Sequence, residues 1–168
     1  MLRNRKDTRL IFIHCAATAS RQDIGVQTIH KWHLERGMFS ERGLSGYHFV
    51  IRRSGLIELG RDLPSIGAHA VGFNEHSASI CLVGGVDKDP KTGELVPKNN
   101  FTDAQWFSLE VLVRALKLIY PDAALAPHNL VSAKACPSFD VYAWQMEKFG
   151  YSDELRARKA IAEIKDED

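Results

Sequence analysis

Apolar residues occur along the chain in short blocks that predict buried β-strands. Residues 10–15 and 79–83 are nearly continuous apolar runs, a pattern typical of strands covered on both faces. Leu125 and Ala126 indicate a shorter strand later in the chain. Residues 46–60 predict a hairpin, because two apolar runs flank the pair Ser54-Gly55.

Other segments have the spacing of amphipathic helices. The clearest follows Thr102, which stands three residues before Gln105 as in a capping box. Residues 23–36 and 138–149 also predict helices, and a glycine follows each. The apolar positions of the clearest helix recur every three or four residues, at Trp106, Leu109, Leu112, Val113, Leu116 and Tyr120.

The order of these elements predicts an α/β fold with a mixed central β-sheet flanked by helices, since strands and helices alternate unevenly and one strand pair forms a hairpin. A length of 168 residues suits a single domain with its own core. The polar stretch 87–100 predicts a surface loop. We expect a basic N-terminal arm at 1–9, the main domain at 10–150, and a tail at 151–168 that is helical or partly disordered.

Charge narrows the class of protein. The hydrophobic share of 45% and the charged share of 26% are those of an ordinary globular protein. A net charge of +1 gives no reason to expect direct nucleic-acid binding. No signal peptide or long apolar span is evident, so membrane insertion is not expected. We expect both charged ends to be solvated tails, namely Arg3, Arg5, Lys6 and Arg9 at the start and Glu163, Asp166, Glu167 and Asp168 at the end.

His14, His128 and Cys136 each stand at the boundary of an expected element, and together they form the protein part of a three-ligand zinc site. A catalytic zinc uses about three protein ligands and keeps a position for water, whereas a structural zinc usually has four. We find no fourth ligand at a suitable spacing. Because side chains alternate along a strand, His14 and Cys15 should project on opposite sides.

The three cysteines have different expected roles. An odd number of cysteines in a chain made in a reducing compartment argues against a disulfide framework. Cys15 and Cys81 lie in apolar runs, so we interpret them as core residues. Cys136 precedes Pro137, which favours an extended backbone, so Lys134 should lie on the same side as Cys136. A neighbouring ammonium lowers the pKa of a thiol and favours its metal-binding form.

Four segments of the chain form a recognisable series. They are Phe12-Ile13-His14-Cys15-Ala16-Ala17-Thr18, Gly46-Tyr47-His48-Phe49-Val50-Ile51, Ile80-Cys81-Leu82-Val83-Gly84-Gly85 and Ala133-Lys134-Ala135-Cys136-Pro137-Ser138-Phe139-Asp140. Together they resemble the phage T7 lysozyme type of N-acetylmuramoyl-L-alanine amidase, a zinc amidase family that includes the peptidoglycan recognition proteins. The resemblance runs from about residue 10 to residue 149, and four motifs in the right order are specific.

The resemblance implies one zinc ion held by His14, His128 and Cys136, with Tyr47 and Lys134 at the catalytic centre. It also implies that the zinc lies at one end of the sheet in a surface groove, so that residues 10–150 form a zinc amidase domain. The family's substrate is peptidoglycan, cut at the amide that joins the lactyl group of N-acetylmuramic acid to L-alanine. Binding-only relatives lack the cysteine ligand, so Cys136 favours activity.

The chemistry of amide hydrolysis agrees with these residues. Zinc supplies a strong nucleophile, because the pKa of its bound water falls to about 7. Zinc and the Lys134 ammonium can both stabilise the oxyanion of the tetrahedral intermediate. Tyr47, which we place on a strand, can orient the water, accept its proton or donate to the oxyanion, and these roles stay open. The irregular stretch 63–78 predicts one wall of the groove, with His69 and Asn74 as candidate substrate contacts.

Two alternatives stay open. T7-type lysozymes can also bind and inhibit the phage's single-subunit RNA polymerase, and the arm at 1–9 is where such binding is expected. A peptidoglycan-binding protein without turnover is the other alternative. The resemblance to single-domain phage lysins implies an endolysin, expected to be a monomer, that is made in the host cytoplasm. It would reach the periplasmic wall after a holin breaches the inner membrane.

Overall fold

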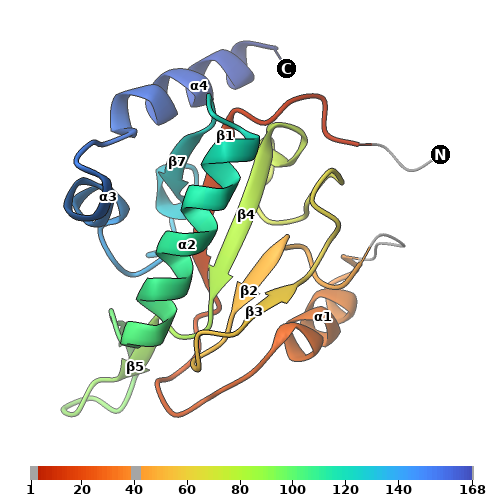
Figure 1. Ribbon diagram of the computed structural model, residues 1–168. Helices are drawn as coiled ribbons and strands as arrows, with labels where there is room; N and C mark the ends of the chain where they lie inside the picture. Colours follow the sequence, from red (N-terminus) through yellow and green to blue (C-terminus); the bar gives the residue numbers. More distant parts are fainter. Residues whose placement is uncertain (1–3, 39–42, 168) are drawn as a thin grey trace.

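A five-stranded mixed β-sheet forms the centre of the computed structural model, which describes residues 4–38 and 43–167 (Figure 1). In the strand order β3-β2-β4-β1-β7, β1 (Leu10–Cys15) lies between β4 (Ser77–Leu82) and β7 (Ala124–Pro127) and runs parallel to both. β2 (Phe49–Ile51) is parallel to β4, and β3 (Ile57–Leu59) pairs with β2 as the predicted antiparallel hairpin. The expected mixed sheet is confirmed.

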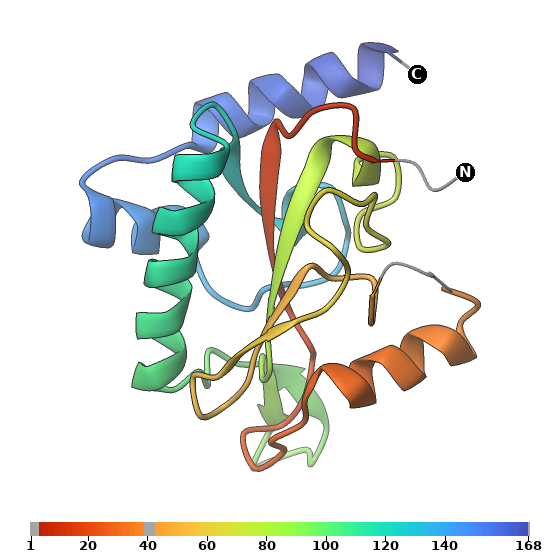
Figure 2. The same ribbon diagram turned by 45° about the vertical axis from the view of Figure 1, so that its right-hand side comes forward.

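Helices cover both faces of this sheet (Figure 2). α2 (Asp103–Ile119) and α3 (Val141–Phe149) pack on the face to which Ile11 and Ile13 of β1 point. On the other face, α4 (Glu154–Glu167) packs against Leu10 and Phe12, and α1 (Val26–Glu35) packs beside Cys81. All six residues of β1 are buried, which explains its unbroken apolar run.

The capping residues set the start of each helix. At α2 the Thr102 hydroxyl accepts from Gln105 N at 3.1 Å and the Gln105 side chain accepts from Thr102 N, so the predicted capping box is present. α1 begins at Val26, three residues after the predicted start. There the Glu58 carboxylate of β3 accepts from Val26 N at 2.6 Å, so a distant acidic side chain supplies the cap.

The stretch 87–100 is not only a loop, and that prediction was wrong in part. β5 (Val86–Lys88) and β6 (Leu95–Pro97) form a separate two-stranded antiparallel sheet. Its turn is held by Asp89. The backbone N–H of Asp89 donates to Glu94 O, and its carbonyl accepts from Gly93 N. The Asp89 carboxylate accepts from Lys91 N and Thr92 N. Most of these side chains are exposed, so no apolar alternation marks the strands in the sequence.

The expectation that both charged ends are solvated tails was wrong in part: Lys6, Glu163 and Asp166 are exposed, but both ends are anchored on the domain, and Arg3 and Asp168 lie outside the described residues. The Arg5 guanidinium is buried and donates to Ser65 O and the Tyr120 hydroxyl. Arg9 forms a bidentate pair with Glu167 at 2.7 and 2.8 Å, so the acidic partner of the basic arm is the protein's own last helix. α4 is anchored because it buries Ala157, Ile161 and Ile164. No helix in the described part of the chain is long and apolar enough to cross a membrane.

Candidate metal centre

The register of the sheet brings His14 and His128 together. In the parallel pair of β1 and β7, Ile13 lies beside Pro127, so the next residues of the two segments are also neighbours. Their imidazole centroids are 4.4 Å apart. His14 projects on the same face as Phe12, whose ring centroid is 6.1 Å away. Both histidines therefore stand at the carboxyl edge of adjacent parallel strands, where open α/β sheets form their sites.

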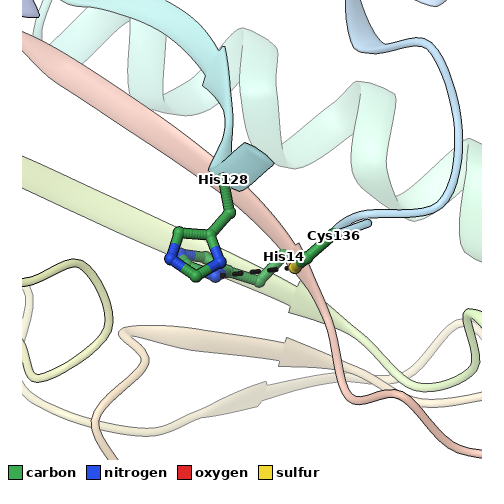
Figure 3. Close-up of side chains that lie close together, drawn as sticks. All are labelled: His14, His128 and Cys136. Carbon is green, nitrogen blue, oxygen red and sulfur yellow. Dashed lines mark hydrogen bonds between the residues drawn. The ribbon is translucent and has the colours of Figure 1, made fainter. Parts of the chain in front are cut away.

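Cys136 reaches the histidines from the loop that follows the short 3-10 helix η2 (His128–Leu130). Asn129 N donates to Cys136 O at 2.7 Å, and Cys15 N donates to Cys136 Sγ at 3.3 Å. These bonds hold the loop against β1 with Cys136 Sγ 3.9 Å from His14 Nδ1 (Figure 3). The backbone here is not extended as predicted, because Cys136 N donates to Lys134 O at 2.8 Å in a three-residue turn.

The three side chains fit a zinc ion. One ligand atom from each of His14, His128 and Cys136 lies within 4.8 Å of the others. Zinc bonds of about 2.0 to 2.3 Å separate tetrahedral ligand atoms by roughly 3.5 Å, so a small contraction would suffice. Two imidazoles and a thiolate are a donor set that zinc takes. Among residues 4–38 and 43–167, no further histidine, cysteine or carboxylate joins this group, which leaves one ligand position open.

Burial favours the uncharged forms of the candidate ligands. It lowers the pKa of His14 well below the ordinary 6.5, and the neighbouring His128 adds to the shift. Burial, and then the charge of Lys134, lower the pKa of His128. Neutral imidazole is the form that binds a metal. A hydrogen bond with the Cys15 thiol and burial raise the pKa of Cys136, so the expected lowering by Lys134 is not observed.

Tyr47 and Lys134 both lie close to these ligands. Tyr47 precedes β2 by two residues, so it is not on a strand as predicted, and its ring centroid is 5.0 Å from that of His14. Burial raises the pKa of its hydroxyl well above the ordinary 10.0, which keeps the hydroxyl a hydrogen-bond donor. The Lys134 side chain is exposed on the loop that carries Cys136, and its positive charge lowers the pKa of His128.

His69 contacts a candidate ligand, and Asn74 holds the backbone of His69. His69 Nδ1 lies 3.2 Å from His14 Nε2. Asn74 Oδ1 accepts from both His69 N and Ala70 N at 2.9 Å, at the start of the 3-10 helix η1 (Asn74–His76). The stretch 63–78 is irregular up to this helix, as expected, but its last two residues, Ser77 and Ala78, begin β4. The substrate contacts predicted for His69 and Asn74 stay predictions.

Two hollows adjoin the segments that carry the ligands. One of about 360 Å³ is lined by Tyr47, by Trp32 and Arg36 at the α1 side, and by residues 16–18, which follow β1. The other, of about 500 Å³, is lined in part by Asn129 and Ala135 of the ligand-bearing loop. A larger hollow of about 680 Å³ lies between α2 and α3. His14, His128 and Cys136 line none of these three hollows themselves, and the first two are candidates for the substrate groove because chain neighbours of the ligands line them.

Sequence reasoning missed the part that Gly85 plays beside the ligands. Its φ is +100°, and a Cβ at this position would lie 2.5 Å from Cys15 Sγ. The thiol of Cys15 thus occupies space that only glycine leaves free, next to Ser138 Oγ at 3.7 Å. The signal was present in the sequence, as the pair Gly84-Gly85 that follows β4.

The protein is an α/β domain with two histidines and a cysteine grouped at the carboxyl edge of a mixed sheet, a candidate metal site of the kind that hydrolytic zinc enzymes use. A family model described as N-acetylmuramoyl-L-alanine amidase matches residues 4–139. The chain belongs to this family, which confirms the resemblance inferred from its four motifs.

Known proteins support the same assignment. The endolysin of Escherichia phage T7 is 44% identical over 142 residues, which are 84% of this chain and 88% of that protein. The endolysin of Klebsiella phage KP32 is 44% identical over 140 residues, 83% of this chain and 87% of that protein. The solved structure of the endolysin amidase LysCS from Clostridium intestinale URNW has 25% identity and a TM-score of 0.71, covering 90% of each chain.

Proposed function

We propose that this protein is an endolysin that hydrolyses the amide between the lactyl group of N-acetylmuramic acid and L-alanine in peptidoglycan, with one zinc ion held by His14, His128 and Cys136. The observation that carries the proposal is the convergence of these three ligand atoms within 4.8 Å at the edge of the sheet, in a chain of the amidase family. The sequence analysis names the same three residues, and two of them, His14 and Cys136, lie inside its motifs.

The residues around this cluster suit the reaction. A zinc ion at the three ligands would supply a nucleophile at neutral pH, because it lowers the pKa of its water to about 7. The Lys134 ammonium, whose charge acts on His128, would stabilise the negative charge that develops on the carbonyl oxygen. The Tyr47 hydroxyl keeps its proton and would donate a hydrogen bond to the same oxygen.

The two hollows suit the two parts of the substrate. The stem peptide would lie in the hollow of about 360 Å³, where Trp32 offers an apolar surface and Arg36 a partner for a peptide carboxylate. The sugar would then lie toward the hollow that Asn129 and Ala135 line. In this proposal the amide to be cut would lie between the two hollows, next to the three candidate ligands.

No structural observation favours either alternative function. In the arm where polymerase binding was expected, residues 1–3 lie outside the described part of the chain, and Arg5 and Arg9 are engaged with Ser65, Tyr120 and Glu167 of the same protein. Polymerase binding, the monomeric state and holin-dependent release from the host cytoplasm stay predictions from the resemblance. Cys136 supports turnover rather than binding alone.

One digestion tests the proposal. Purified peptidoglycan is treated with the protein, with and without a zinc chelator, and the products are identified by mass spectrometry. We expect free stem peptides that begin with L-alanine, and we expect the chelator to prevent their release. Released disaccharides with intact lactyl–peptide bonds would indicate a glycosidase and overturn the proposal, as would release that continues after zinc has been removed.

A further inference from the structure

The two ring nitrogens of His14 face different partners. Nδ1 lies 3.9 Å from Cys136 Sγ, on the side where the three candidate ligands converge. Nε2 lies 3.2 Å from His69 Nδ1. An imidazole carries its two nitrogens on different sides of the ring, so His69 cannot share an ion with the Nδ1 of His14. His69 therefore contacts the candidate ligand His14 without itself being a ligand, which we call an outer partner of His14.

With a metal on Nδ1 of His14, this contact sets the tautomer of both rings. A histidine that binds a metal through Nδ1 carries its proton on Nε2, and that proton needs an acceptor. The only described partner of His14 Nε2 is His69 Nδ1, so His69 must carry its own proton on Nε2. Buried metal-binding histidines usually donate this proton to a carboxylate, a carbonyl or a water. Here a second neutral imidazole takes that place.

The surroundings hold the His69 ring in this orientation. A Cβ at Gly67 would lie 2.4 Å from His69 Cδ2 and 2.8 Å from Nε2, so glycine leaves room for the ring. Phe12 packs edge-on against it with centroids 6.0 Å apart. Asn74 fixes the backbone through two hydrogen bonds of 2.9 Å. The His69 Nε2 atom is buried and has no hydrogen-bond partner. Burying an unpaired polar atom costs free energy, so the surrounding contacts must hold the ring in this position.

We propose that His69 is a positioning residue that accepts the Nε2 proton of His14 and so presents His14 Nδ1 to the metal. The inference rests on the proposed function only in that the three ligands bind zinc. Loss of such an outer partner weakens metal affinity by about 10- to 100-fold. His69 thereby connects the loop 63–78 to the metal site, a different role from the substrate contact predicted for it.

The test compares two replacements of similar volume. In His69→Asn the amide oxygen can take the place of the Nδ1 acceptor, whereas His69→Leu has no acceptor. Zinc dissociation constants are measured by competition with a chromophoric chelator on folded protein, and unfolding of the metal-free proteins is measured in parallel. We expect His69→Leu to bind zinc about 10- to 100-fold more weakly than wild type and His69→Asn to remain within about threefold.

A matched control comes from His76, which is also buried and is hydrogen-bonded to Asp7. His76→Asn and His76→Leu should lower stability without changing zinc affinity. Equal zinc affinity in wild type and His69→Leu overturns the inference, and so does an equally weak affinity in His69→Asn and His69→Leu. If wild type itself does not bind zinc, the proposed function fails first, so the two failures can be told apart.

Discussion

The carboxylate of Asp153 accepts a hydrogen bond from the Lys117 ammonium at 2.6 Å, and the Asp153 side chain has no exposed surface. The same oxygen, Oδ2, accepts from Leu125 N and from Gln145 Nε2, both at 2.9 Å. These donors belong to α2, β7 and α3, and Asp153 itself immediately precedes α4. One buried carboxylate thus joins four elements at the β7 edge of the sheet, which is the edge opposite β3.

Asp153→Asn should destabilise the fold by about 3 kcal/mol, because it leaves the mostly buried Lys117 ammonium without its counter-charge. The measurement is urea unfolding at neutral pH. Asp166→Asn removes an exposed carboxylate of α4 and is the matched control, with an expected change below about 0.5 kcal/mol. Equal stability of the two variants would mean that the Lys117 pair contributes nothing net.

The contribution of Asp153 should depend on pH in a defined direction. Burial alone would raise the pKa of its carboxyl, but the Leu125 amide, Lys117 and Gln145 together bring it below the ordinary 3.8. A pKa lowered by folding gives stability that is present above the unfolded-state pKa and is lost as pH falls through the folded-state pKa. The stability difference between wild type and Asp153→Asn should hold from about pH 7 to 5 and shrink below about pH 4.

Urea unfolding of both proteins across this range is the check. A difference that stays constant down to about pH 2 would show that the carboxyl is not the ionised partner assumed here.

The sequence predicted the elements whose apolar pattern is strong. β1 and β4 are buried on both faces, β1 and residues 79–83 appear as nearly continuous apolar runs, and α2 carries both its capping box and its apolar spacing. β5 and β6 escaped prediction because none of their residues is buried and their pairing depends on a turn at Asp89. The packing of α4 also depends on contacts that no local pattern encodes.

The candidate ligands were predictable for a related reason. His14 and His128 each follow an apolar run, and parallel strands bring their carboxyl ends to one edge. The position of Lys134 was argued from an extended backbone at Cys136, and the three-residue turn there removes that argument. The His14–His69 contact joins segments 55 residues apart, so only the folded chain reveals it.

Cys136→Ala should abolish zinc binding and lysis while the fold largely survives, because the proposed ligand Cys136 stands on a loop and not in the sheet. Cys15→Ala is a stringent control, since its thiol is buried beside Cys136 but is not among the candidate ligands. It should keep its zinc, because the substitution removes the Cys15 thiol beside Cys136 but keeps the backbone N–H of residue 15 that donates to Cys136 Sγ. Zinc content and clearing of a cell-wall suspension are measured together. Full activity in metal-free Cys136→Ala would contradict the proposed mechanism.

Arg5→Ala should lower stability by about 2 kcal/mol, because Ser65 O and the Tyr120 hydroxyl lose charge-assisted hydrogen bonds of 3.0 and 3.1 Å inside the protein. Lys6→Ala is the control from the same arm, since the Lys6 side chain is 64% exposed and should contribute almost nothing. Thermal unfolding of the three proteins decides the matter. Equal melting temperatures for Arg5→Ala and Lys6→Ala would restore the interpretation of the arm as a solvated tail.

Lys134→Ala should lower turnover on purified peptidoglycan about 100-fold and leave zinc content nearly unchanged, because the ammonium stabilises charge that develops only in the transition state. The exposed position of Lys134 on its loop means that folding should not suffer. Lys165→Ala removes an exposed lysine from α4 and should leave the rate unchanged. The measurement is kcat on peptidoglycan together with the zinc content of wild type, Lys134→Ala and Lys165→Ala. An unchanged kcat in Lys134→Ala would remove this residue from the catalytic centre, and a parallel loss of zinc would assign it to metal binding instead.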